Sequence, residues 1–180
     1  MKALIITYEK YQDHEVIYPY YRLLEETENV SVASNKEGSV TGILGCSVKS
    51  NILISEFSRA EMYEAMLNDY DFLVLPGGVK AMEKLRQEKM VIKFIADWNE
   101  KNKIIACTCS GAQLLISAKI VKGRTISAYY SMEDDIINAG AVYSPAPVVR
   151  DGNIITSPHY DFMAKWLREA INVYRQEKNG

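Results

Sequence analysis

Short, almost continuously hydrophobic runs alternate along the chain with longer segments whose apolar positions repeat every three or four residues. The short runs cover residues 2–7, 30–33, 71–75 and 103–107. Runs of this kind are typical of strands that are buried on both faces of a parallel sheet. The alternation of strands and helices predicts an α/β fold with a mostly parallel sheet and helices on both of its faces.

The longer segments are amphipathic and are predicted to form helices. They cover residues 16–25, 58–67, 83–99 and 161–176. Ser58 and Glu61 form a capping-box pattern at the start of the second helix. Ser131 is predicted to cap a further helix with an acidic first turn, which ends before Gly140.

Two hairpins are expected in addition to the parallel strands. Glycines punctuate residues 38–48, which predicts a small hairpin that residues 51–55 extend. Asp151 and Gly152 lie between two apolar runs and predict a second hairpin. We find no repeat, linker or low-complexity segment, so we expect residues 1–180 to form a single domain.

Composition and charge narrow the partners that this chain is expected to bind. Hydrophobic residues make up 48% of the sequence, and 21 Lys and Arg oppose 23 Asp and Glu, for a net charge of -2. The charge predicts neither a nucleic-acid nor a membrane partner. The first apolar run is too short for a signal peptide, and no run reaches the roughly 18 residues of a membrane span, so we expect a cytoplasmic protein.

The three cysteines differ in their surroundings. Cys109 lies where a buried strand turns into a helix, with small residues two positions before and after it, which is the spacing of a nucleophile elbow. A cysteine at a helix start is expected to be more acidic than a free thiol. Cys107 and Cys46 are expected to be packing residues, and a redox pair with Cys109 is the alternative for Cys107. Without CxxC pairs or histidine clusters, we expect neither a disulfide framework nor a metal site.

Several further segments fit one known family together with the elbow. They are Asp13-His-Glu15, Tyr18-Pro-Tyr-Tyr-Arg-Leu, Val74-Leu-Pro-Gly-Gly78, Gly123-Arg124, Asp134-Asp135-Ile-Ile-Asn-Ala-Gly140 and Val149-Arg-Asp-Gly-Asn-Ile-Ile-Thr156. In this order, nearly the whole chain resembles the ThiJ/PfpI family of the class I glutamine amidotransferase-like superfamily. The resemblance implies a flavodoxin-like three-layer sandwich, a homo-oligomer, a reactive elbow cysteine and no cofactor.

The resemblance also assigns roles to residues. Cys109 takes the position of the nucleophile, and the backbone amides of Gly78 and Ser110 take the positions of oxyanion donors. Such donors stabilise the negative oxygen that forms when a nucleophile attacks a carbonyl group. Gly77 either forms part of a tight turn or allows the backbone to approach the ligand closely.

Two departures from the family pattern concern proton transfer. Ser110 stands where peptidase-like members have a histidine, and a serine cannot act as a general base near neutral pH. An ungapped alignment places Gln12 where the family has an acid. The amide of Gln12 can donate a hydrogen bond to a thiolate but cannot carry a proton. Glu9 and Glu15 are the possible substitutes for that acid. The alternative is a solvated loop residue for Glu9 and a charge in the first helical turn for Glu15.

Three more residues are candidates for substrate binding. His159 is either a base near the nucleophile or an exposed loop residue. Glu83 matches an acid that some oligomeric family members present to a neighbouring active site, although a helix-surface charge is the alternative. Tyr129 either lines the pocket with its hydroxyl group or packs in the core.

These residues favour a cysteine-dependent enzyme that acts on a small electrophilic carbonyl or acyl compound, as a hydrolase or in a glyoxalase-like or deglycase-like reaction. Peptide hydrolysis is not expected, because Ser110 occupies the histidine position. One alternative is a non-catalytic stress-protective protein in which Cys109 is oxidised reversibly. A passive binding scaffold with an unreactive Cys109 is the third interpretation.

Overall fold

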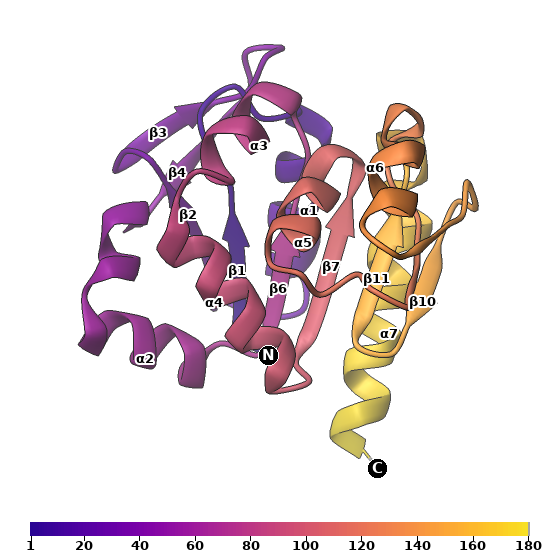
Figure 1. Ribbon diagram of the computed structural model, residues 1–180. Helices are drawn as coiled ribbons and strands as arrows, with labels where there is room; N and C mark the ends of the chain where they lie inside the picture. The colour runs from indigo at the N-terminus through magenta and orange to yellow at the C-terminus, as the bar shows by residue number, and fades with distance from the viewer. Residues whose placement is uncertain (180) are drawn as a thin grey trace.

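The computed structural model describes residues 1–179, in which a seven-stranded sheet lies between helical layers (Figure 1). The strand order is β10-β11-β7-β6-β1-β2-β5. The strands are β1 Ala3–Ile6, β2 Val30–Ser34, β5 Ile52–Leu53, β6 Phe72–Leu75, β7 Ile104–Thr108, β10 Val149–Asp151 and β11 Ile154–Ser157. All neighbouring strands are parallel except β10 and β11. The predicted α/β class is therefore confirmed.

Helices cover both faces of this sheet. The α-helices are α1 Asp13–Leu24, α2 Ala60–Asp69, α3 Val79–Leu85, α4 Lys89–Glu100, α5 Ala112–Ser117, α6 Glu133–Asn138 and α7 Met163–Asn179. Short 3-10 helices are η1 Ile54–Ser58, η2 Cys109–Gly111, η3 Tyr130–Met132 and η4 Tyr160–Phe162. α1 and α7 pack together on one face, and α4 packs against α5 on the other with α2 beside it (Figure 1).

The inner strands explain why the sequence runs are so hydrophobic. Every residue of β1, β6 and β7 is buried, because helices cover these strands on both sides. The amphipathic helices add Trp98 from α4 and Trp166 from α7, both fully buried. Burial of such large side chains provides most of the favourable free energy of folding.

The two predicted hairpins are present. β3 Gly38–Thr41 and β4 Ser47–Ser50 form a separate antiparallel pair, and β10 pairs with β11 through a turn in which Gly152 has a φ of +61°. A second small sheet joins β8 Thr125–Ile126 to β9 Val142–Tyr143.

The expectation that residues 51–55 extend the first hairpin is wrong. Ile52 and Leu53 instead pair in parallel with β2 at the edge of the main sheet, and η1 follows them. The backbone and side chain of Asn51 cause this, because both form hydrogen bonds with the backbone of Val32.

Three details of the predicted helices are also wrong. Residues 83–99 form the end of α3 and most of α4, because the chain turns at residues 86–88 to bury the apolar faces of both helices. Ser58 does not cap α2, since it is the last residue of η1 and Arg59 precedes the helix. Ser131 lies inside η3, so α6 begins at Glu133, although its acidic first turn and Gly140 are as predicted.

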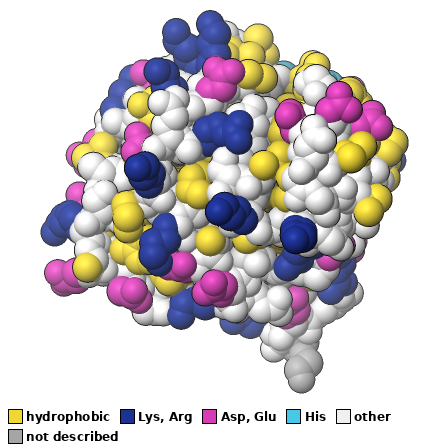
Figure 2. Space-filling view, in the orientation of Figure 1, with side chains coloured by type: hydrophobic (Ala, Val, Ile, Leu, Met, Phe, Trp, Pro, Cys, Tyr) yellow, Lys and Arg dark blue, Asp and Glu magenta, His cyan; other side chains and the backbone are white. Residues whose placement is uncertain are grey.

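Charges are mixed on the surface. Figure 2 shows Lys and Arg side chains interspersed with Asp and Glu on the face that it presents, without a basic stripe. Within residues 1–179, no helix is both long enough and apolar enough to cross a membrane.

Candidate active site

Four chain segments leave the carboxyl ends of the neighbouring strands β1, β6, β7 and β11 and meet at a pocket of about 260 Å³. Ligands of open parallel sheets bind at this end of the strands. The predicted residues that line the pocket are Gln12, Glu15, Gly78, Cys109, Ser110, Tyr129 and His159. Ile43, Val79 and Tyr160 also line it and were not predicted.

Cys109 occupies a strained turn between β7 and α5. Its φ is +55°, a left-handed conformation that costs a non-glycine residue free energy and is often found at functional sites. The turn packs closely on the end of β6, since a Cβ atom on Gly111 would lie 2.6 Å from the carbonyl oxygens of Leu75 and Pro76. The predicted sharp turn from strand to helix at Cys109 is thus confirmed.

Glu15 points from the first turn of α1 into the same place. Its side chain is fully buried, and its Oε2 atom accepts a hydrogen bond of 2.6 Å from the N–H of Gly77. A Cβ atom on Gly77 would lie 2.4 Å from Oε2 of Glu15, 2.8 Å from Cβ of Cys109 and 3.0 Å from Oγ of Ser110. The side chains of Glu15, Cys109 and Ser110 therefore converge around a position that has room only for glycine.

The structure decides between the two interpretations of Glu15, because the carboxyl group beside Cys109 belongs to this residue. The site therefore does not lack an acid, although Gln12 occupies the aligned position. Gln12 precedes the helix as its N-cap, and the helix turns Glu15, three residues later, toward the elbow. An ungapped count along the loop between β1 and α1 could not reveal this turn. Gln12 still lines the pocket, but within residues 1–179 its buried Oε1 atom has no hydrogen-bond partner.

The electrostatics of the pair differ from those expected of an isolated elbow cysteine. Burial raises the pKa of Glu15 to about 7, although the N–H of Gly77 lowers it. Burial and the Glu15 carboxylate raise the pKa of the Cys109 thiol above its ordinary value, so the predicted acidic cysteine is wrong. The Glu15 carboxyl group and the Cys109 thiol therefore titrate as a pair: the first proton leaves near pH 7, and the resulting negative charge opposes loss of the second.

The expected oxyanion donors, Gly78 and Ser110, line the same pocket as Cys109. The backbone N–H of Ser110 interacts with the Cys109 sulfur and lowers its pKa. Gly78 has a φ of +106° and precedes α3, and a Cβ atom there would lie 2.6 Å from the backbone nitrogen of Gln12. The amide of Gly77 is already bound to the Glu15 carboxylate, and Gly77 is not among the residues that line the pocket, so a close approach of Gly77 to the ligand stays a prediction.

Aromatic rings form one wall of the pocket. The N–H of Tyr129 donates to the carbonyl oxygen of Cys109, which fixes this residue beside the elbow. The ring of His159 is tilted against that of Tyr160, with 3.8 Å between the ring centroids, and stacks on that of Tyr129 at 6.2 Å. His159 is only 18% exposed, and its Nδ1 atom accepts from the N–H of Asp161. Tyr160 could have been suspected from its position next to His159.

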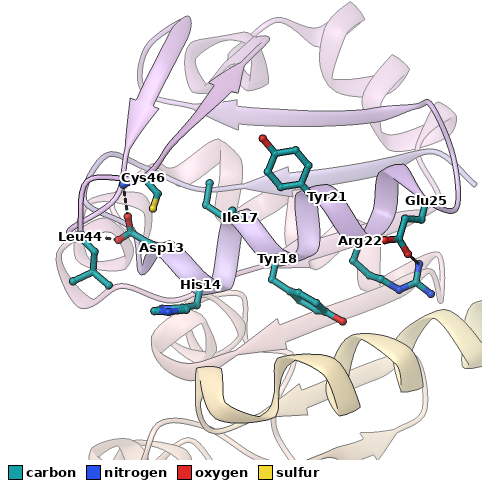
Figure 3. Close-up of a pocket in the computed structure, with 9 residues that line it drawn as sticks. All are labelled: Asp13, His14, Ile17, Tyr18, Tyr21, Arg22, Glu25, Leu44 and Cys46. Atoms are coloured by element: carbon teal, nitrogen blue, oxygen red, sulfur yellow. Dashed lines mark hydrogen bonds and ion pairs between the residues drawn. The ribbon is translucent and has the colours of Figure 1, made fainter.

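Asp13 fixes the start of α1 and was missed as a structural residue. Its carboxylate accepts hydrogen bonds of 2.7 Å from the N–H groups of Leu44 and Cys46 in the β3–β4 turn (Figure 3). Cys46 is exposed there, beside a groove of about 440 Å³ along α1, so its expected role in packing is wrong. The contact ties the turn to the helix that carries Glu15.

Glu83 and Cys107 lie outside this pocket. Glu83 lines a separate polar cavity between α3, α5 and α6, together with Arg86 and Asp135. Cys107 is buried in β7, and burial raises its pKa, as suits a packing residue. In the part of the chain that the structure describes, no three His, Cys, Asp or Glu side chains are placed to hold a metal ion.

Comparisons with known proteins bear on the family and the fold of this chain. Residues 1–173 match the DJ-1/PfpI family. Over 175 residues, the chain is 37% identical to deglycase PfpI of Pyrococcus furiosus and 36% identical to deglycase PH1704 of Pyrococcus horikoshii, which covers 97% of this chain and 100% of each relative. The structure of Schizosaccharomyces pombe DJ-1 is similar with a TM-score of 0.83, at 18% identity over 98% of this chain and 91% of that one.

The fold, the elbow and a family match over almost the full length lead to the same assignment. This chain belongs to the DJ-1/PfpI family.

Proposed function

We propose that this protein is a cysteine-dependent enzyme that removes small carbonyl groups from amines or thiols, a deglycase-like activity. The observation that carries the proposal is the convergence of Glu15, Cys109 and Ser110 around Gly77. A carboxyl group with a pKa of about 7 suits a general base at neutral pH. The deglycase names of two relatives that are 36% and 37% identical support the same activity.

In this proposal the first step forms a covalent adduct. The Cys109 sulfur attacks the carbonyl carbon, a C–S bond forms, and the π-electron pair moves to oxygen. The Glu15 carboxylate accepts the thiol proton, and the amides of Gly78 and Ser110 hold the negative oxygen. When the substrate is a carbinolamine, in which the carbonyl compound is already bound to an amine, the sulfur displaces the amine from the carbinol carbon. The C–S bond forms, the C–N bond breaks, and Glu15 passes the thiol proton to the amine nitrogen.

The later steps need only water. If a second carbonyl group is adjacent, transfer of a proton between the two carbons converts the hemithioacetal into a thioester. Water then cleaves the C–S bond, which releases a 2-hydroxy acid and restores the thiol. Oxidation of one carbon balances reduction of the next, so no external oxidant or reductant is consumed. Peptide hydrolysis is not proposed, since Ser110 cannot act as its base.

The experiment measures 2-hydroxy acid release from methylglyoxal and from its N-acetylcysteine adduct. Cys109→Ser is expected to lower turnover at least about 100-fold, whereas Cys46→Ala, which changes an exposed thiol outside the pocket, keeps it. Release by the wild type no faster than in buffer, or equal release by Cys109→Ser, contradicts the proposal.

We also propose that the protein associates with itself. The support is a set of large apolar side chains that stay exposed along α1 and the β3–β4 turn, namely Tyr21, Leu24, Ile43 and Leu44. Sedimentation equilibrium is expected to give at least twice the chain mass of 20.4 kDa. A mass equal to that of one chain contradicts the proposal.

A further inference from the structure

We propose that Gln12, Glu15 and Ser110 form a polar subsite for a hydroxyl or N–H group on the carbon next to the reacting carbonyl. The substrate class is then an uncharged α-hydroxy or α-amino carbonyl compound rather than a plain aldehyde. This inference rests on the proposed attack by Cys109 and adds the part of the substrate that the pocket recognises.

Three buried polar atoms without partners point to this subsite. Of six buried side-chain nitrogen and oxygen atoms that have no hydrogen-bond partner in residues 1–179, three belong to the Cys109 pocket. They are Oε1 of Gln12, Oε1 of Glu15 and Oγ of Ser110. An unpaired buried polar atom costs free energy, so such atoms in one pocket indicate a ligand that pairs with them. Glu15 and Ser110 are at least 99% buried. The Cys109 thiol interacts with both side chains, but it gives up its proton in the proposed attack, so both side chains then lack it as a hydrogen-bond donor.

The chemistry of these atoms defines the complementary group. An amide oxygen and a carboxylate oxygen only accept hydrogen bonds, while the hydroxyl group of Ser110 both donates and accepts. The carbonyl oxygen of a plain aldehyde also only accepts, so it cannot satisfy Gln12 or ionised Glu15. A hydroxyl or amine group beside the carbonyl supplies the missing donor, and an early adduct of a dicarbonyl with an amine carries such groups.

The remaining lining residues favour an uncharged compound. Tyr129, His159 and Tyr160 give the pocket an aromatic wall, which packs well against C–H groups. Among residues 1–179, no Lys or Arg lines this pocket, so a phosphate group would find no fixed cation there. The pocket therefore does not suit a sugar phosphate.

The experiment compares two aldehydes of nearly equal size. Glycolaldehyde carries a hydroxyl group where propionaldehyde has a methyl group. Each aldehyde is added at increasing concentration, and its protection of Cys109 from iodoacetamide labelling is measured. Mass spectrometry of the peptide that contains Cys109 gives the labelled fraction. The apparent dissociation constant of each aldehyde is corrected for the fraction of the aldehyde that is hydrated. It is then divided by the dissociation constant of the adduct that the same aldehyde forms with N-acetylcysteine, which removes differences in electrophilicity.

The wild type is expected to prefer glycolaldehyde by about tenfold or more, because a site built to hydrogen-bond a hydroxyl group rejects the analogue that lacks it. Gln12→Met removes the acceptor at similar size and is expected to reduce the preference below about threefold. Gln87→Met, which changes an exposed glutamine outside the pocket, serves as the matched control and keeps the preference.

A wild-type preference below about threefold overturns the subsite, even if Gln12→Met fails to fold. An unchanged preference in folded Gln12→Met overturns the role of Gln12. If neither aldehyde protects Cys109, the proposed carbonyl chemistry fails as well, so the two failures are distinguishable.

Discussion

Glu15 illustrates how burial turns an ordinary side chain into a functional one. In water this carboxyl group is charged at neutral pH, but inside the protein the charged form lacks solvation, which raises its pKa to about 7. The hydrogen bond from Gly77 holds the group in place beside Cys109. A base that is half ionised near neutral pH can accept a proton and return it within one reaction.

The same pKa makes stability depend on pH. The folded protein binds a proton at Glu15 up to about pH 7, while the unfolded chain releases it near pH 4.5, so the stability of the wild type falls as pH rises between these values. The shift corresponds to about 3 kcal/mol. Glu15→Gln stays uncharged and is expected to gain stability relative to the wild type from pH 4.5 to pH 8. Urea unfolding at both pH values measures this, and equal pH dependence in the two proteins contradicts the assignment.

Among the elements, the elbow depends on close contact between β6 and the turn after β7. Gly111 has an ordinary backbone conformation, so only the short distances to the carbonyl oxygens of Leu75 and Pro76 exclude a side chain. Gly111→Ala is expected to cost about 2 kcal/mol or more of unfolding free energy and to slow labelling of Cys109.

Gly123→Ala provides the comparison. Gly123 has a φ of +75°, and within residues 1–179 no atom outside its chain neighbours lies within 4 Å of the position that a Cβ atom would take there. The cost of this substitution is expected to be about 1 kcal/mol, from the left-handed backbone alone. A smaller loss in Gly111→Ala than in Gly123→Ala, measured by urea unfolding, contradicts the account of the elbow.

An element could be predicted when the pattern that specifies it is local in the sequence. Buried strands such as β1 and β7 could be predicted because their hydrophobic runs are local and continuous. The break between α3 and α4 could not be predicted, since the chain turns at residues 86–88 so that each helix can bury its own apolar face. The pairing of β5 with β2 depends on Asn51 bonding to Val32, a contact between residues that are far apart in sequence.

The residues of the candidate site also differ in whether the sequence could predict them. The sharp turn at Cys109 could be predicted from the spacing of small residues around it, whereas Gly78 was implied by the family resemblance. The choice between Gln12 and Glu15 could not, because it depends on where α1 begins and which side of its first turn faces the elbow. The pKa of Cys109 was missed because it depends on burial and on Glu15, neither of which a local pattern contains.

At the scale of the whole molecule, the sheet assembles one site from segments that are distant in sequence. The carboxyl ends of β1, β6, β7 and β11 place Glu15, Gly78, Cys109 and His159 around one pocket. The β3–β4 turn, held by Asp13, adds Ile43 to its rim. The central claim is therefore that Glu15 and Cys109 titrate and react as a pair.

The most direct test is the pH dependence of iodoacetamide labelling of Cys109, with Cys46 and Cys107 replaced by Ala. The labelling rate is expected to rise through an apparent pKa of about 7, because deprotonation of the pair activates the thiol. Glu15→Gln is expected to move the midpoint upward by about one pH unit or more, since burial still raises the pKa of the thiol and its proton acceptor is gone. Cys109→Ser is the control for background labelling. The same midpoint in both proteins, or a wild-type midpoint near the value of about 8.5 of a free thiol, contradicts the pair.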